Sequence, residues 1–273
     1  MNMKHLFLAV LGGITLLCNS CVQQQMQQIA YNSKVVVLDI GHYFEPTRGG
    51  QGARTPDARH GGIIEETEFW YRYAGEVKKT IEAAGYTCLI CNRGDMPRNP
   101  RLAEAARRAG VHHVKSPQPT AIYRSTHHPH RIAVGMLSTN YALDQQPGAV
   151  VYLHHNSNSE TWRVFNKGAF YCNERGVRLA QTMAQVMSRD ILDNPDNGMP
   201  NHGVPCGVVL RTDGRRGGGD WLNACNESFV PAVITEVAFL SNPEHARYLS
   251  SHENAVKFAQ AIGRGVVEYM NAR

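Results

Sequence analysis

The sequence predicts an α/β fold, built as one domain around a mainly parallel, twisted sheet with helices on both faces. Several apolar runs of strand length lack polar alternation, which is typical of strands buried on both faces. They are the segments 35–40, 86–91, 149–153 and 231–239. A predicted helix connects the first two runs, and a strand, helix, strand order indicates parallel pairing. The 273 residues show no internal repeat and no second hydrophobic core, so we expect a single domain.

The first helix is predicted over 65–84 by its apolar spacing. Phe69, Val77 and Ile81 recur at helical intervals along one stripe, and Gly85 is suited to end the helix. The same reasoning predicts further helices at 101–109, 131–143, 174–192 and 254–271, and further strands at 168–172 and 207–211.

The amino-terminal residues 1–20 predict a secretory signal peptide. A positive charge precedes the apolar run 6–17, which is too short to span a membrane comfortably. Cys21 and the residue before it resemble a bacterial lipoprotein cleavage site, with free secretion as the alternative. We therefore expect an exported protein, in the periplasm or anchored by a lipid to the outer membrane. Residues 21–31 are its linker and 32–273 its folded domain.

The formal net charge of +5 is mild. It fits an anionic partner such as a cell-wall polymer or a membrane surface, and equally an ordinary soluble surface. No basic run or aromatic-interleaved basic patch points to nucleic acid.

Five cysteines follow Cys21, and an odd number leaves at least one thiol unpaired within a monomer. Cys88 and Cys91 form a CxxC pair of the kind that can bind zinc or do redox chemistry. Their segment is a predicted strand, however, so their side chains point to opposite faces. We interpret both as buried structural cysteines.

Polar residues interrupt or follow three of the apolar strands. His42 follows the first, His154 and His155 follow the third, and Glu236 lies inside the last. Because the carboxyl ends of parallel strands meet at one edge of a sheet, we expect these side chains to lie close together. A buried carboxylate is costly unless it is paired or functional. We interpret Glu236 as functional, with a salt bridge to an arginine as the alternative.

The helix at 65–84 opens with two further carboxylates, Glu65 and Glu66. Two histidines and one carboxylate are a common catalytic zinc set that leaves a fourth position for water. A second carboxylate can then act as acid and base. The strand ends and the helix start therefore predict a hydrolytic zinc site.

The segment 93–129 is the least regular part of the chain and is rich in histidine. We interpret it as an insertion that covers the site, with direct metal binding by its histidines as the alternative. Its histidines, with the one that follows it, are His112, His113, His127, His128 and His130.

The motifs VVVLDIGH, EAAGY, YLHHNS and VITEVAFLSNPEHARYL resemble the zinc-dependent N-acetylmuramoyl-L-alanine amidases of bacterial cell walls. The resemblance runs from about residue 34 to residue 273, and TEVAFLSNPE is its most specific part. It implies one Zn²⁺ and hydrolysis of the amide between N-acetylmuramic acid and L-alanine in peptidoglycan. Carried over by position, it implies zinc ligands at His42, Glu66 and His154 and a catalytic Glu236.

Two of these assignments involve a choice. In the family, the second histidine is followed by one residue and then by asparagine. Here Asn156 takes that place, which selects His154 over His155. Counting back along the helix from the AGY turn favours Glu66, with Glu65 as the alternative.

The chain departs from the family pattern in three places. Residues 43–45 replace the start of a glycine-rich segment, His155 replaces a small residue, and 93–129 is longer than expected. Arg93 and Arg131, the latter at the start of a predicted helix, match family positions, for which we expect a structural or substrate-orienting role.

Two other functions remain open. One is a zinc peptidase that acts on cell-wall peptides, and the other is a non-catalytic, peptidoglycan-binding lipoprotein. The buried carboxylate at Glu236 favours an enzyme, because binding alone would not require it.

Overall fold

The computed structural model of the chain describes residues 34–45, 49–50, 65–114, 123–124, 131–132, 141–142, 144–156, 168–196, 198–210, 225, 228 and 230–273. The predicted signal peptide, the linker and the cysteine proposed as lipid anchor lie outside these residues. Among the described helices, none is long and apolar enough to cross a membrane.

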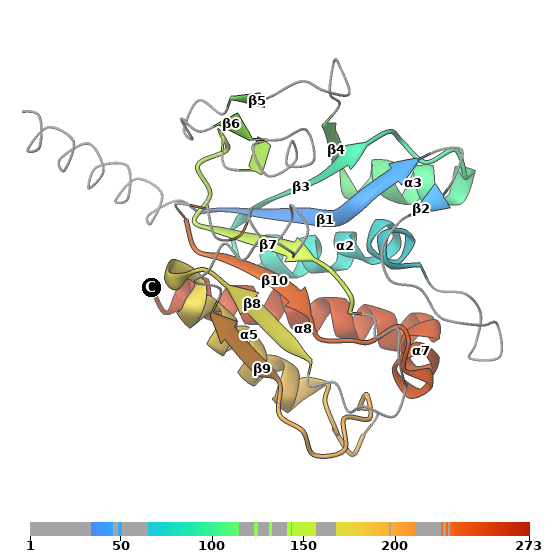
Figure 1. The fold of residues 1–273 in the computed structure, drawn as a ribbon, viewed down its shortest axis with the longest axis vertical. Coiled ribbons are helices and arrows are strands. Elements are labelled where there is room, and N and C mark those ends of the chain that lie inside the picture. The colour runs from blue at the N-terminus through green and yellow to red at the C-terminus, as the bar shows by residue number, and fades with distance from the viewer. Residues whose placement is uncertain are drawn as a thin grey trace, which may run out of the picture.

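One mixed sheet forms the centre of the molecule (Figure 1). Five neighbouring strands are parallel, while the two at the far edge run in the opposite direction. In spatial order they are β4 (Val111–Val114), β3 (Thr87–Gly94), β1 (Val35–Glu45), β7 (Ala149–Leu153), β10 (Ala232–Glu236), β8 (Ala169–Cys172) and β9 (Gly207–Leu210). The short β2 (Gly49–Gly50) pairs antiparallel with β1. The prediction of a mainly parallel sheet is confirmed.

Helices pack along one face of the sheet, where α8 contacts both α2 and α5 (Figure 1). The described helices of eight or more residues all contribute to one large apolar cluster with this face. They are α2 (Glu66–Ala83), α3 (Pro100–Ala109), α5 (Val177–Asp190, preceded by a 3₁₀ turn at Glu174–Gly176), α7 (Pro243–Ser250) and α8 (His252–Asn271).

The opposite face of the sheet carries a smaller apolar cluster. There Val150, Tyr152 and Ile234 pack with Ala142 and Cys225, whose backbones are helical. Helical residues therefore lie against both faces, and the apolar strands are buried between them, as their lack of polar alternation predicts.

The CxxC pair lies in β3 and divides between the two faces. Cys88 belongs to the larger cluster and Cys91 to the smaller one. Neither thiol forms a disulfide, and the same holds for the other described cysteines. This confirms the interpretation of both residues as buried structural cysteines.

The region between β3 and β7 differs from the prediction. The prediction of a helix over 131–143 is wrong for its first two residues. Arg131–Ile132 forms the strand β6, which pairs antiparallel with β5 (Tyr123–Arg124). Cross-strand pairing satisfies these backbone groups in place of a helical turn. The sequence also did not predict β4, whose central residues are histidines and which forms an edge of the sheet.

Candidate metal centre

The first candidate ligand, His42, lies in a bulge of β1. The register between β1 and β3 shifts between Ile40 and Tyr43, so Gly41 and His42 are extra residues in β1. His42 has a φ of 61°, a left-handed conformation that non-glycine residues adopt rarely. The bulge therefore redirects the chain where the side chain of His42 leaves the strand.

The second candidate ligand, Glu66, is the first residue of α2. Its side chain is 1% exposed. Glu65 precedes it as the extended cap residue of the helix and is only partly buried. The helix start thus turns Glu66, and not the alternative Glu65, into the cluster of candidate ligands.

The third candidate ligand, His154, follows β7 directly. Its backbone is held by Thr235 of β10, whose Oγ1 accepts a hydrogen bond from the His154 N–H at 3.0 Å and donates one to its carbonyl at 3.1 Å. Its imidazole lies so close to Gly41 that a Cβ there would be 2.4 Å from Cε1. The glycine is therefore required by the close approach of the ring.

The three side chains meet around one point. Glu66 Oε2 lies 3.1 Å from His42 Nε2, and Glu66 Oε1 lies 2.9 Å from His154 Nδ1. One ligand atom from each residue lies within 4.8 Å of the other two. Two imidazole nitrogens and a carboxylate oxygen are the donor set of a catalytic zinc site, so the residues fit this ion. Among the described residues, no other group of this kind occurs.

The two histidines also determine the charge state of Glu66. Burial acts to raise the pKa of this carboxyl. Hydrogen bonds with His154 and His42, together with the attraction of their charges, outweigh it and hold the pKa well below its usual range. Glu66 is therefore an anion between two imidazoles, as a metal ligand must be.

Glu236 ends β10 beside the candidate ligands. The residue before it, Thr235, pairs with Leu153, which precedes His154. The Glu236 side chain is buried, and its Oε2 has no hydrogen-bond partner among the described residues. Burial raises its pKa to about 8, partly opposed by the charge of His154. A carboxyl group with a pKa near neutrality next to a cation site is suited to acid and base chemistry.

His155 does not join the cluster. Its ring stacks on Trp70 with centroids 4.9 Å apart and meets the edge of Phe69 at 4.6 Å. Burial lowers its pKa to about 3, so the ring is neutral. Its backbone N–H donates to Glu66 Oε1 at 2.9 Å. The structure thus distinguishes the two adjacent histidines, and only His154 faces the other ligands.

The histidine-rich segment is described only in part. Its residues 100–114 form α3 and β4, which extend the sheet beside β3. In β4, His112 stacks on Tyr141 and His113 stacks on Tyr71. The other three histidines lie outside the described residues, as does most of 115–130.

Sequence reasoning missed two residues that support the site, Asn92 and Thr235. Both act by hydrogen bonds to the backbone of β1 or to that of His154, which follows β7. The only signal for either in the sequence is a polar residue at the end of an apolar strand. Arg93 follows Asn92 in β3, and Arg131 lies in β6.

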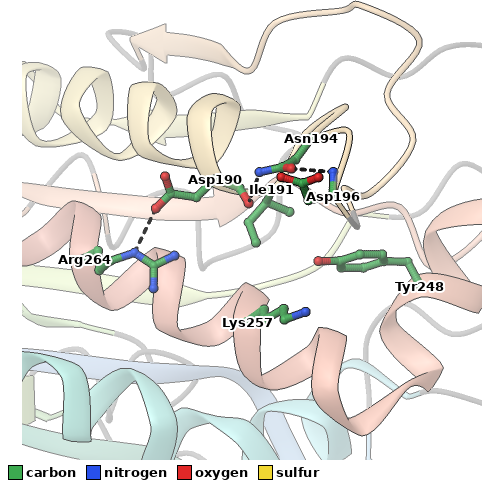
Figure 2. A pocket seen from close by; sticks show the side chains of 7 residues that line it. All are labelled: Asp190, Ile191, Asn194, Asp196, Tyr248, Lys257 and Arg264. Carbon is green, nitrogen blue, oxygen red and sulfur yellow. Dashed lines mark hydrogen bonds and ion pairs between the residues drawn. The ribbon is translucent and has the colours of Figure 1, made fainter.

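A separate pocket of about 340 Å³ lies between α5, α7 and α8 (Figure 2). Its walls carry opposite charges, and Arg264 Nε lies 2.8 Å from Asp190 Oδ2. Ile191, Asn194, Asp196, Tyr248 and Lys257 complete its lining. The pocket contains no histidine and none of the candidate ligands, so it is separate from the candidate metal centre.

Known proteins share this fold. AmiC2, an N-acetylmuramoyl-L-alanine amidase of Nostoc punctiforme, superposes with a TM-score of 0.53 at 18% identity, over 87% of this chain and 97% of that one. The CwlD amidase of Clostridioides difficile superposes with a TM-score of 0.56 at 14% identity, over 88% of this chain and 100% of that one. At such identities, the likeness supports the fold alone.

The sequence comparisons support the family. The chain is 27% identical over 246 residues to N-acetylmuramoyl-L-alanine amidase AmiC of Neisseria meningitidis serogroup B, covering 87% of this chain and 53% of that protein. It thus spans about half the length of this relative. A family model described as N-acetylmuramoyl-L-alanine amidase matches residues 36–268. Because this match covers most of the chain, the protein belongs to the N-acetylmuramoyl-L-alanine amidase family.

Proposed function

We propose that the protein is a zinc-dependent peptidoglycan hydrolase that cleaves the amide between N-acetylmuramic acid and L-alanine of the stem peptide. The observation that carries this proposal is the meeting of His42, Glu66 and His154 around one point beside the buried Glu236. Membership of the amidase family supports the choice of substrate.

His42, Glu66 and His154 are the residues that would hold the zinc ion. When bound, zinc would supply a Lewis acid that polarises the amide carbonyl. It would also lower the pKa of water, so that water can lose a proton and attack at neutral pH. Glu66 brings one negative charge to this set, and the Thr235 hydroxyl holds the backbone of His154 in place. Held backbones preorganise the ligands before substrate binds.

Glu236 carries the proton. It accepts the proton that the attacking water gives up and transfers it to the nitrogen of the leaving L-alanine as the C–N bond breaks. The pKa of about 8 applies to the protein without a cation, and a nearby positive charge favours the ionised form needed to accept a proton. After transfer, the carboxyl is ionised again and ready for another cycle.

The direct test is mass spectrometry of the material that the zinc-loaded protein releases from purified peptidoglycan. The expected products are intact stem peptides with a free amino-terminal L-alanine, and chelation should abolish their release. Glu236→Gln should lose at least about 100-fold in rate while it retains zinc, since general acid and base catalysis contributes about that much. Near-full hydrolysis by this variant would contradict the role of Glu236.

The same experiment separates the two alternatives. Fragments cut within the stem peptide would identify a zinc peptidase. Binding to peptidoglycan without release of any peptide would identify a non-catalytic binding protein.

For localisation, we propose that residues 1–20 direct export and that Cys21 carries a lipid which anchors the catalytic domain, 32–273, to a membrane facing the periplasm. The support is the sequence pattern of this segment. Cys21→Ser should move the protein from the membrane fraction to the soluble fraction of bacterial cells. An unchanged distribution would exclude the anchor.

A further inference from the structure

The backbone that carries His42 is held from the side by the buried Asn92 of β3. The Asn92 amide nitrogen donates to the carbonyl of Ile40 at 2.7 Å and to that of His42 at 3.2 Å. The first carbonyl belongs to the residue before the two extra residues of β1, and the second belongs to the second extra residue. One side chain thus joins both ends of the bulge.

The same side chain also reaches the helix that carries Glu66. The Asn92 oxygen accepts a hydrogen bond at 2.8 Å from the hydroxyl of Tyr71, which lies in α2. Both Asn92 and Tyr71 are fully buried. The amide therefore uses its nitrogen on the strand of one candidate ligand and its oxygen on the helix of another.

We propose that Asn92 is a positioning residue of the metal centre, which holds His42 in its left-handed backbone conformation and ties it to the helix of Glu66. The proposal rests on the zinc site put forward above. A left-handed conformation at a non-glycine residue is strained and persists only where its surroundings enforce it. The hydrogen bonds from Asn92 to the two carbonyls supply that constraint.

Asn92→Asp is the sharpest variant. It preserves the size of the side chain and the oxygen that accepts from Tyr71, but it replaces the N–H groups that face two carbonyls with an acceptor. We expect zinc affinity, measured by competition with a chromophoric chelator on the full chain, to fall about 10- to 100-fold, as for other groups that support metal ligands.

The matched control is Asn173, a second buried asparagine, which lies just after β8. Its amide nitrogen donates to the carbonyls of Ser228 and Val230, each at 2.9 Å, and its oxygen accepts from backbone N–H groups. Its oxygen bonds the N–H of Ala232, which begins β10, whereas Glu236 ends that strand. Asn173→Asp should lower the melting temperature of the metal-free protein, as Asn92→Asp does, but leave zinc affinity unchanged.

Tyr71→Phe is the milder variant for the case in which Asn92→Asp does not fold. It removes the hydroxyl that bonds Asn92 and leaves both carbonyl contacts in place. Zinc affinity should fall, and by less than in Asn92→Asp.

The outcomes separate this proposal from the function on which it rests. Wild-type zinc affinity in a folded Asn92→Asp, or in Tyr71→Phe when Asn92→Asp does not fold, would make Asn92 a purely structural residue and overturn the proposal. An equal loss of zinc affinity in Asn173→Asp would do the same, because the effect would then follow general destabilisation. Failure of the zinc site itself would appear as equal zinc affinity in wild type and His42→Ala.

Discussion

At the scale of single residues, Gly41 makes room for one of the candidate ligands. The missing side chain of Gly41 leaves the space that the His154 ring occupies. Gly41→Ala should displace this ring and reduce zinc affinity at least about tenfold. Zinc content per chain after dialysis is the measurement.

Gly75 in α2 provides the control for that variant. A Cβ there would meet only Ala109, at 3.4 Å, which is ordinary van der Waals contact. Gly75→Ala should therefore keep full zinc content and stabilise the protein by up to about 1 kcal/mol, because alanine is the better helix former. Full zinc content in Gly41→Ala would show that the ring has room to move.

Glu236 should make stability depend on pH. Its pKa of about 8 in the folded, metal-free protein lies above the ordinary value of 4.5, so the folded state binds the proton more tightly than the unfolded state. The proton on Glu236 therefore stabilises the folded state, fully below pH 4.5 and progressively less as the pH rises towards 8. Wild type should therefore lose stability relative to Glu236→Gln across this range, by up to about 1.4 kcal/mol per pH unit.

Urea unfolding of both metal-free proteins at several pH values measures this difference. Stability curves that stay parallel from pH 4.5 to 8 would show that Glu236 titrates normally.

The fold class predicted that the two strand-end histidine positions and Glu236 would lie close together, because the carboxyl ends of parallel strands meet at one edge of a sheet. The choice of Glu66 and of His154 came from the resemblance to the amidase family. His154 follows β7 and Glu236 ends β10, as predicted, but His42 lies within β1, which continues past it to Glu45 after the bulge. The sequence could not predict the proposed role of Asn92, because that role depends on which carbonyls of β1 lie opposite it. The register between β1 and β3 is set by a bulge which no residue pattern specifies.

Among the elements, α7 is joined to the segment after β10 by a buried histidine. His245 Nδ1 accepts from the N–H of Phe239 at 3.1 Å, so its Nε2 carries the proton that bonds the Pro200 carbonyl at 2.8 Å. Burial lowers the pKa of His245, although the bond to Pro200 opposes this. The ring is therefore held neutral, and a second proton would break its bond to Phe239.

This predicts that His245 stabilises the protein above its ordinary pKa of 6.5 and loses that contribution as the pH falls. His245→Gln should lower the free energy of unfolding by about 1–3 kcal/mol near pH 8, because a buried N–H loses its partner. The difference should shrink towards pH 5. Thermal unfolding measures it, with the exposed His202→Gln as control. A difference independent of pH would contradict a neutral ring.

Elements with a clear amphipathic stripe or a continuous apolar run were predicted well, whereas β4, which has neither, was not predicted. The amphipathic stripe of α2 predicts a helix, and the apolar run of β7 predicts a buried strand. The edge strand β4 lacks a continuous apolar run, because its two central residues are His112 and His113. Its place depends on pairing with β3, which is a tertiary interaction.

At the scale of the whole molecule, bound zinc should hold together β1, α2 and the end of β7, which lie far apart in the sequence. A ligand that binds only the folded state stabilises it, by about 2.7 kcal/mol at a free concentration one hundred times its dissociation constant. Thermal unfolding with zinc and with a chelator should show this shift. It should disappear in His42→Ala and persist in His112→Ala, whose side chain in β4 lies outside the cluster. Loss of the shift in both variants would indicate metal binding elsewhere.

The position of β10 has a consequence for synthesis of the chain. This strand is the last in the sequence, yet it lies between β7 and β8 in the middle of the sheet. Until it has been made, both neighbours keep an unpaired edge, and the sheet depends on a contact that forms late. Glu236 arrives at the end of that same strand. A chain interrupted before this point therefore lacks both the centre of its sheet and the proposed proton carrier, so we expect a truncated product to be inactive.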